Sequence, residues 1–145
     1  MKIWGKKTLF LSSTDTTLGF LSRSKRRLNL AKNREGKEYI TALGSLRDIK
    51  YRVPKNCKKL VKRAKRVTFI LPNGFSFRIV RDKNHLLLIK RFGWLYTTSA
   101  NESGKEYDYL FAKSRADVVI YPLKERGKPS KILRLSKRGK IKRVR

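Results

Sequence analysis

Short β-rich runs alternate with segments of helical periodicity along the whole sequence. The run 66–71 and the run 75–80 flank Pro72-Asn73-Gly74, which is a strong hairpin signal. Further β-type runs occupy 8–13, 38–43, 94–98, 117–121, 131–135 and 140–144. The last two surround Lys137-Arg138-Gly139 and predict a basic C-terminal hairpin over 131–144. Strands that alternate with helices, together with hairpins, predict one α/β domain over 1–145 with a twisted, open, mixed sheet and flanking helices.

The helical segments lie between these runs. The N-cap residues 14–17 predict a helix that follows at once, with Leu18, Leu21 and Leu28 on its apolar face. Asp82 and Gly93 are typical of the two ends of a helix over 83–92. A short helix is expected around 105–113. A further helix is expected after Pro54, and its apolar positions have a helical spacing: Cys57, Leu60, Val61 and Ala64.

The charge of the chain is strongly positive. The sequence holds 39 Lys and Arg but 10 Asp and Glu, so the formal net charge is +29. Such an excess is costly through self-repulsion unless an anion offsets it, and RNA is an abundant polyanion. An ordinary solvated surface is the alternative, and an anionic membrane is less favoured. From the basic clusters we expect an RNA-facing surface that includes Arg26, Arg27, Lys58, Lys62, Arg138 and Lys142.

Several classes of protein are excluded. One cysteine and one histidine, His85, allow neither a disulfide framework nor a zinc site from this chain alone. Cys57 is expected to be a small core residue. The sequence has no P-loop, no dinucleotide fingerprint, no nucleophile elbow and no RNP motif. No apolar run is long enough for a bilayer or a secretory signal, so we expect a cytoplasmic protein.

Three polar segments remain as candidates for a site. They are 13–19 and 97–104, each at a strand end, and Lys32-Asn33-Arg34 with Lys37 close behind. Ligands of open α/β sheets bind beyond the strand ends, and Lys32 and Arg34 are suited to the phosphates of a nucleotide. These segments therefore predict a site for a small anion and a nucleotide.

The same segments carry a resemblance to a known family. Residues 98–104, Thr-Ser-Ala-Asn-Glu-Ser-Gly, are similar to the T-S-A-N-x-S-G loop of the YrdC-like threonylcarbamoyl-AMP synthases. Residues 13–19 resemble the family's P-T-D/E-T-x-x-G, 32–34 its K-x-R, and 127–132 its G-x-P-S-T-I. The four matches fall in the family's order, and the resemblance covers about 8–136. The chain resembles a short, divergent member.

This resemblance implies an enzyme with the YrdC-like fold. Family members join threonine, bicarbonate and ATP into threonylcarbamoyl-AMP and pyrophosphate, and partner proteins use the product to modify tRNA. Mg²⁺ would be carried by the phosphates of ATP, with no metal ligand from the protein. By the resemblance, the threonine residues would be Thr14, Arg78, Ser99 and Ser130, and the ATP residues Lys32, Arg34 and Asn101. Arg81 is the alternative to Arg78, and a non-catalytic relative that binds structured RNA is the alternative function.

Overall fold

The computed structural model describes residues 4–34, 38–124 and 128–145. Within them, nine strands form one mixed sheet in the order β7-β1-β2-β6-β3-β5-β4-β8-β9. The strands are β1 (Phe10–Ser13), β2 (Leu18–Ser22), β3 (Ile40–Leu43), β4 (Val67–Ile70), β5 (Ser76–Ile79), β6 (Trp94–Ser99), β7 (Val118–Ile120), β8 (Lys131–Leu135) and β9 (Ile141–Arg143). The pairs β1–β7, β3–β5 and β4–β8 are parallel, and the other neighbours are antiparallel. The expected mixed α/β sheet is therefore confirmed.

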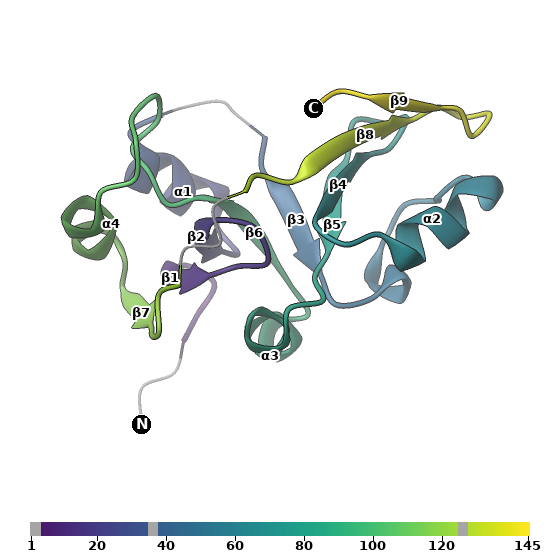
Figure 1. The fold of residues 1–145 in the computed structure, drawn as a ribbon. Helices are drawn as coiled ribbons and strands as arrows, with labels where there is room; N and C mark the ends of the chain where they lie inside the picture. Colours follow the sequence, from purple (N-terminus) through teal and green to yellow (C-terminus); the bar gives the residue numbers. More distant parts are fainter. Residues whose placement is uncertain (1–3, 35–37, 125–127) are drawn as a thin grey trace.

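Four α-helices accompany the sheet in the described part of the chain (Figure 1). They are α1 (Lys25–Lys32), α2 (Lys58–Arg63), α3 (Lys83–Phe92) and α4 (Tyr109–Arg115), and two short 3₁₀ turns are η1 (Leu46–Asp48) and η2 (Lys55–Cys57). None of these helices is both long and apolar enough to span a bilayer, as far as the described residues extend.

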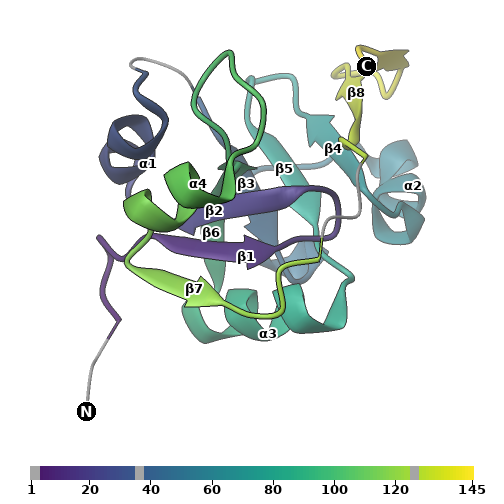
Figure 2. The same ribbon diagram turned by 60° about the vertical axis from the view of Figure 1, so that its left-hand side comes forward.

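The core has three parts that follow the placement of the helices. Leu9, Leu11 and Phe20 pack with α1 and α4, whereas Phe10 and Leu21 pack with α3 on the opposite face. Figure 2 shows α4 and α3 on either side of β1 and β2. The third part joins α2 to β4, β5 and β8; it contains Cys57, Val61, Phe69, Leu71, Phe77, Ile79 and Leu135. Cys57 is fully buried there, which confirms its assignment to the core.

The prediction of a helix directly after residues 14–17 is wrong. Leu18–Ser22 forms β2, which pairs with β1 and β6 and is buried along its whole length. Leu18 and Leu21 serve opposite faces of the sheet, so their three-residue spacing only mimics a helical face. The helix begins instead at Lys25, where the Ser24 side chain accepts a hydrogen bond from the Arg27 amide.

Most of the other boundaries agree with expectation. Asp82 and Gly93 cap α3 at its two ends, and the hairpins β4–β5 and β8–β9 form around the predicted turns. The helix expected around 105–113 lies further along the chain, at Tyr109–Arg115. It begins there because the Asp108 side chain caps its first turn.

Candidate functional site

A cavity of about 270 Å³ lies where several strand ends meet. Since β2 runs antiparallel to both β1 and β6, the carboxyl ends of β1 and β6 lie at the same edge of the sheet. The turn after β1 and the end of β6 therefore face one space. The lining residues are Thr14, Thr16, Thr17, Arg34, Glu38, Tyr39, Ile40, Arg78, Thr97, Thr98, Ser99, Pro129, Ser130 and Arg145.

Five of the seven residues predicted to bind threonine or ATP line this cavity. They come from every one of the four resembling segments and from β5: Thr14, Arg34, Arg78, Ser99 and Ser130. Lys32 and Asn101 are not among the lining residues but lie directly behind Ser99, as described below. Arg81, the alternative to Arg78, lies elsewhere: its side chain donates to the Ala64 carbonyl and lines a depression beside α2.

The turn after β1 is fixed by its own threonines. The Thr14 hydroxyl donates to the Thr17 carbonyl and accepts from the Thr16 amide at 3.2 Å. Gly19 lies so close to this turn that a Cβ there would stand 2.7 Å from the Thr14 methyl carbon and 3.1 Å from the Thr98 carbonyl. The glycine of the motif therefore allows the turn and β6 to approach each other.

Arg78 is a buried cation at the base of the cavity. Its Nε lies 3.1 Å from Asp15 Oδ1, and its Nη1 lies 3.3 Å from the Thr68 hydroxyl, which is 2.8 Å from the Ser130 hydroxyl. Burial lowers the pKa of the Arg78 guanidinium, and the neighbouring Asp15 carboxylate acts in the opposite direction. An arginine guanidinium keeps its charge in proteins. A fixed cation in such a cavity is suited to hold a carboxylate or phosphate.

Asp15 is the counter-ion of Arg78, a role that the sequence reasoning did not assign. Burial alone raises the pKa of the Asp15 carboxyl, but His85 and Arg78 together outweigh this and hold it below its ordinary value of 3.8. Nδ1 of His85 lies 3.7 Å from the carboxylate, and the ring is fully buried. Asp15 belongs to the motif at 13–19, but only the position of β5 in the sheet shows that its partner is Arg78.

Lys32 links α1 to the loop after β6. Its side chain is 2% exposed, and Nζ donates to the Ser99 carbonyl at 2.8 Å and to Asn101 Oδ1 at 3.0 Å. The Asn101 amide in turn donates to the Lys105 carbonyl at 2.6 Å. Lys32 and Asn101 thus hold the loop that presents Ser99 to the cavity.

Arg145 and Tyr39 are two lining residues that the sequence reasoning missed. The Arg145 guanidinium donates twice to the Ser130 carbonyl, at 3.1 and 3.2 Å, and hydrogen bonds to Ile132 hold its backbone against β8. The Tyr39 hydroxyl accepts from Arg34 Nε at 3.3 Å, and the Arg34 guanidinium lies 4.8 Å from the Tyr39 ring centre. Neither residue belongs to a quoted motif, so only the fold brings them here.

The six residues expected to face RNA lie at two ends of the sheet. Arg26 and Arg27 are on α1, whereas Lys58, Lys62, Arg138 and Lys142 are on α2 and the β8–β9 hairpin at the other end (Figure 1). Five of them are exposed, but Arg27 is half-buried and pairs with Asp117 at 3.3 Å. Among the residues that the structure describes, no cluster of His, Cys, Asp and Glu could hold a metal ion.

Comparisons with known proteins identify the fold. No protein-family model and no curated protein matches the sequence. A variant of Sua5 from P. abyssi superposes with a TM-score of 0.79 at 21% identity, over 90% of this chain and 47% of that one. P. abyssi Sua5 complexed with L-threonine superposes with a TM-score of 0.78 at 20% identity, over 89% of this chain and 47% of that one. YciO from E. coli superposes with a TM-score of 0.70 at 16% identity, over 95% of this chain and 82% of that one.

This chain spans about half the length of the two Sua5 structures and most of the length of YciO. The superpositions cover 89–95% of this chain. The fold implied by the four short motifs is therefore confirmed: the chain has the YrdC-like α/β fold that Sua5 and YciO share.

Proposed function

We propose that this protein is a threonylcarbamoyl-AMP synthase. The observation that carries the proposal is the convergence of Thr14, Arg34, Arg78, Ser99 and Ser130 on one cavity of about 270 Å³. These residues are far apart in the sequence: four come from the four segments that resemble one family, and Arg78 comes from β5. A structural neighbour, P. abyssi Sua5, was solved complexed with L-threonine, which supports threonine as the ligand of this cavity.

The proposed chemistry joins two anions. The threonine amine and bicarbonate give a carbamate and water, a carbamate oxygen then bonds to the α-phosphorus of ATP, and the bond from that phosphorus to the β-phosphate oxygen breaks. Pyrophosphate leaves with both electrons of that bond. The main barrier is repulsion between the carbamate and the triphosphate, so fixed cations and positioning can supply much of the catalysis.

The lining residues have matching roles in this proposal. Arg78 holds the threonine carboxylate, with Thr14, Ser99 and Ser130 around the rest of the amino acid. Arg34 faces the phosphates and the carbamate, and Lys32 and Asn101 act next to it by holding the loop at Ser99. Mg²⁺ arrives with ATP as part of the substrate, because phosphate oxygens are its preferred ligands. The product would pass, with proteins of the modification pathway, to tRNA.

The decisive measurement is pyrophosphate release from ATP with threonine and bicarbonate present. We expect release that requires all three substrates. Release that continues without threonine would contradict the substrate, and no release under any combination would leave the alternative of a non-catalytic RNA-binding relative.

Two variants test whether the reaction uses this cavity. Arg145→Gln removes a lining cation whose neighbours are Ser130 and Arg78, so we expect a higher KM for threonine with an unchanged fold. Arg143→Gln is the matched control, since Arg143 is an exposed residue of β9 that does not line the cavity. Equal kinetic parameters in the two variants would count against a role of Arg145 in threonine binding.

A further inference from the structure

Two segments at one end of the molecule are rich in positive charge and contain no acidic residue. Residues 49–81 and 128–145 contain 20 Lys and Arg and no Asp or Glu. These segments form η2, α2, β4, β5, β8 and β9, which lie together at one end of the sheet (Figure 1). Apart from Arg78, which pairs with Asp15, none of these cations forms an ion pair with a carboxylate in the described part of the chain. Their charge is available to an external anion.

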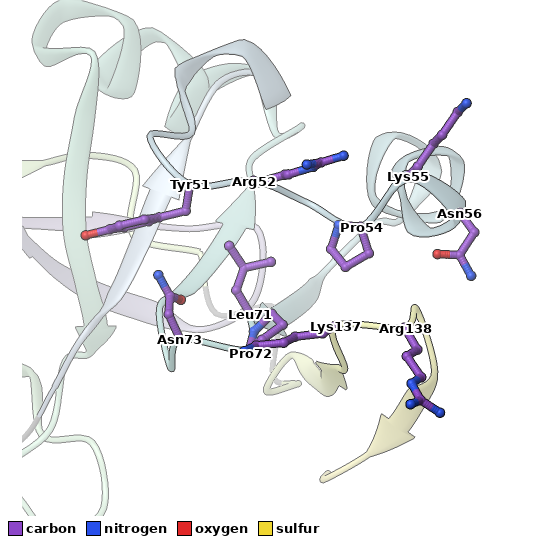
Figure 3. Close-up of a pocket in the computed structure, with 10 residues that line it drawn as sticks. All are labelled: Tyr51, Arg52, Pro54, Lys55, Asn56, Leu71, Pro72, Asn73, Lys137 and Arg138. Atoms are coloured by element: carbon purple, nitrogen blue, oxygen red, sulfur yellow. The ribbon is translucent and has the colours of Figure 1, made fainter.

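A groove of about 1150 Å³ opens at this end (Figure 3). The segment from Tyr51 to Asn56 forms one wall, and the turns at 71–73 and 137–138 form the other. Four of its lining residues are cations: Arg52, Lys55, Lys137 and Arg138. Between them lie the apolar or aromatic groups Tyr51, Pro54, Leu71 and Pro72. The groove therefore offers both charge and flat apolar surface.

The two walls are joined at one end, so the groove exists before any ligand binds. The Asn56 side chain lies directly against Gly139 and donates to its carbonyl at 3.4 Å, and the Cys57 thiol reaches the same carbonyl at 3.5 Å. This contact locks η2 onto the turn of the β8–β9 hairpin. A preformed site loses less conformational entropy on binding than a mobile one.

The positive surface continues beside the groove. An adjoining depression of about 570 Å³ shares Tyr51 and Arg52 with it, and its other cations are Arg47, Lys58, Lys62 and Arg81. No carboxylate lines either space within the described residues. A run of cations along connected hollows fits a chain of anionic groups better than a single small anion.

We infer that this groove binds an unpaired strand of nucleic acid. Phosphates would lie on Arg52, Lys55, Lys137 and Arg138, and a base would stack on Tyr51, whose side chain is half exposed although it packs against Phe75. Single-strand sites combine a cationic groove with aromatic side chains in this way. The apolar groups between the cations favour an unpaired strand over a closed duplex, because the faces of the bases in a duplex are stacked on one another and cannot contact these groups.

This inference is independent of the proposed function. The groove shares no lining residue with the cavity of the candidate site, so either site can be removed without the other. A strand bound here would nevertheless lie near that cavity. A depression of about 400 Å³ between the two is lined by Tyr51 and Asn73 of the groove and by Glu38 and Tyr39 of the cavity.

The test uses fluorescence anisotropy with the full chain and labelled strands of about 12 nucleotides, within the ~4–16 nucleotides typical of single-strand sites. The probes are an RNA strand, the DNA strand of the same sequence, the RNA duplex and inorganic polyphosphate. We expect the single strands to bind more tightly than the duplex. Equal affinity for RNA and DNA means that the backbone and bases are recognised, and tighter binding of RNA means that the ribose hydroxyl is recognised too; both support the groove.

Two variants locate the binding. Lys137→Ala with Arg138→Ala removes two exposed cations of the groove, and we expect weaker binding and a salt slope smaller by about 1.4, because each single-strand phosphate contact contributes roughly 0.7. Lys83→Ala with Lys90→Ala is the control, since it removes the same charge from exposed positions on α3. Tyr51→Ala should weaken strand binding roughly 5- to 150-fold but leave polyphosphate binding nearly unchanged.

Three outcomes would overturn the inference. Equal losses in the two double variants would show that net charge alone drives binding. A duplex that binds as tightly as the single strands would contradict the unpaired form. Competition by polyglutamate at the same concentration as by RNA would point instead to an acidic protein.

Discussion

Arg78 illustrates how single residues build the candidate site. The side chain is 4% exposed, and such a charge is stable in the interior only when a partner compensates it. The Asp15 carboxylate is that partner and accepts a hydrogen bond from Arg78 Nε, while the Thr68 hydroxyl accepts one from Arg78 Nη1. The guanidinium is therefore held in one orientation at the cavity, which is what precise recognition of an anion requires.

Replacing Asp15 tests this arrangement through pH. We expect Asp15→Asn to lower the free energy of unfolding by about 3–5 kcal/mol at pH 7, since it leaves the Arg78 charge buried without its partner. The pKa of the Asp15 carboxyl is lowered in the folded protein, so the carboxylate stabilises the fold above its ordinary pKa of 3.8. That contribution is lost as the pH falls through the folded-state pKa. Urea unfolding of both proteins from pH 7 down to about pH 3 should show the difference shrinking below pH 4.

Asp117→Asn is the control for this measurement. Asp117 pairs with Arg27 at the surface, where its side chain is 46% exposed, and such pairs contribute less than about 1 kcal/mol. A loss as small for Asp15→Asn as for Asp117→Asn, or one that is the same at every pH, would contradict a buried ion pair.

The sequence predicts the site residues unevenly. Thr14, Arg34 and Ser99 lie in polar segments that the sequence alone marks as candidates, and the structure places them along the cavity. Ser130, which also lines the cavity, was named only through the resemblance. Arg78 was preferred over Arg81 only by the resemblance. Asp15 as a counter-ion and Arg145 as a lining residue depend on pairings between distant strands, which no local pattern in a single sequence reveals.

Among the elements, the β8–β9 hairpin contributes to both the candidate cavity and the basic groove. Its far end places Arg145 in the candidate cavity, and its turn places Lys137, Arg138 and Gly139 at the basic groove. Gly139 has φ +82°, a left-handed conformation that costs other residues roughly 1–2 kcal/mol. The turn therefore depends on glycine both for its backbone and for its contact with Asn56.

Gly139→Ala should destabilise the protein more than Gly74→Ala. Both glycines have positive φ, so both variants lose the backbone term of about 1–2 kcal/mol. A Cβ at Gly74 meets nothing within 4 Å, whereas a Cβ at Gly139 would overlap the Asn56 amide and displace it. Thermal or urea unfolding of the two variants gives the comparison. Equal losses would show that the contact between Asn56 and Gly139 contributes nothing to stability.

The burial of β2 explains why the sequence predicted a helix where this strand forms. Edge and half-buried elements such as α3 carry a regular pattern and clear caps, and their bounds were predicted within a residue or two. β2 is buried on both faces, so it lacks the alternation that identifies a strand. Its identity depends on β1 and β6 lying on either side of it, which only the assembled sheet provides.

At the scale of the whole molecule, charge and core are distributed differently. The three parts of the core extend along the entire sheet, but all ten acidic residues of the sequence lie outside 49–81 and 128–145. The end that holds α2 and the β8–β9 hairpin is therefore under self-repulsion whenever no anion is bound. The hydrophobic contacts of Val61, Phe77 and Leu135 must hold this end together against that repulsion.

Reversing one charge at that end should stabilise the free protein. We expect Lys140→Glu, at an exposed position between β8 and β9, to raise the melting temperature by about 1–2 °C at low salt. Lys6→Glu makes the same change at an exposed position outside the acid-free segments and should raise it less. Both gains should fade as salt increases, because the Debye length shortens from about 30 Å at 0.01 M to about 3 Å at 1 M. If the two variants melt alike at low salt, the repulsion is spread evenly over the molecule, and the basic groove loses the electrostatic reason for an anionic partner at that end.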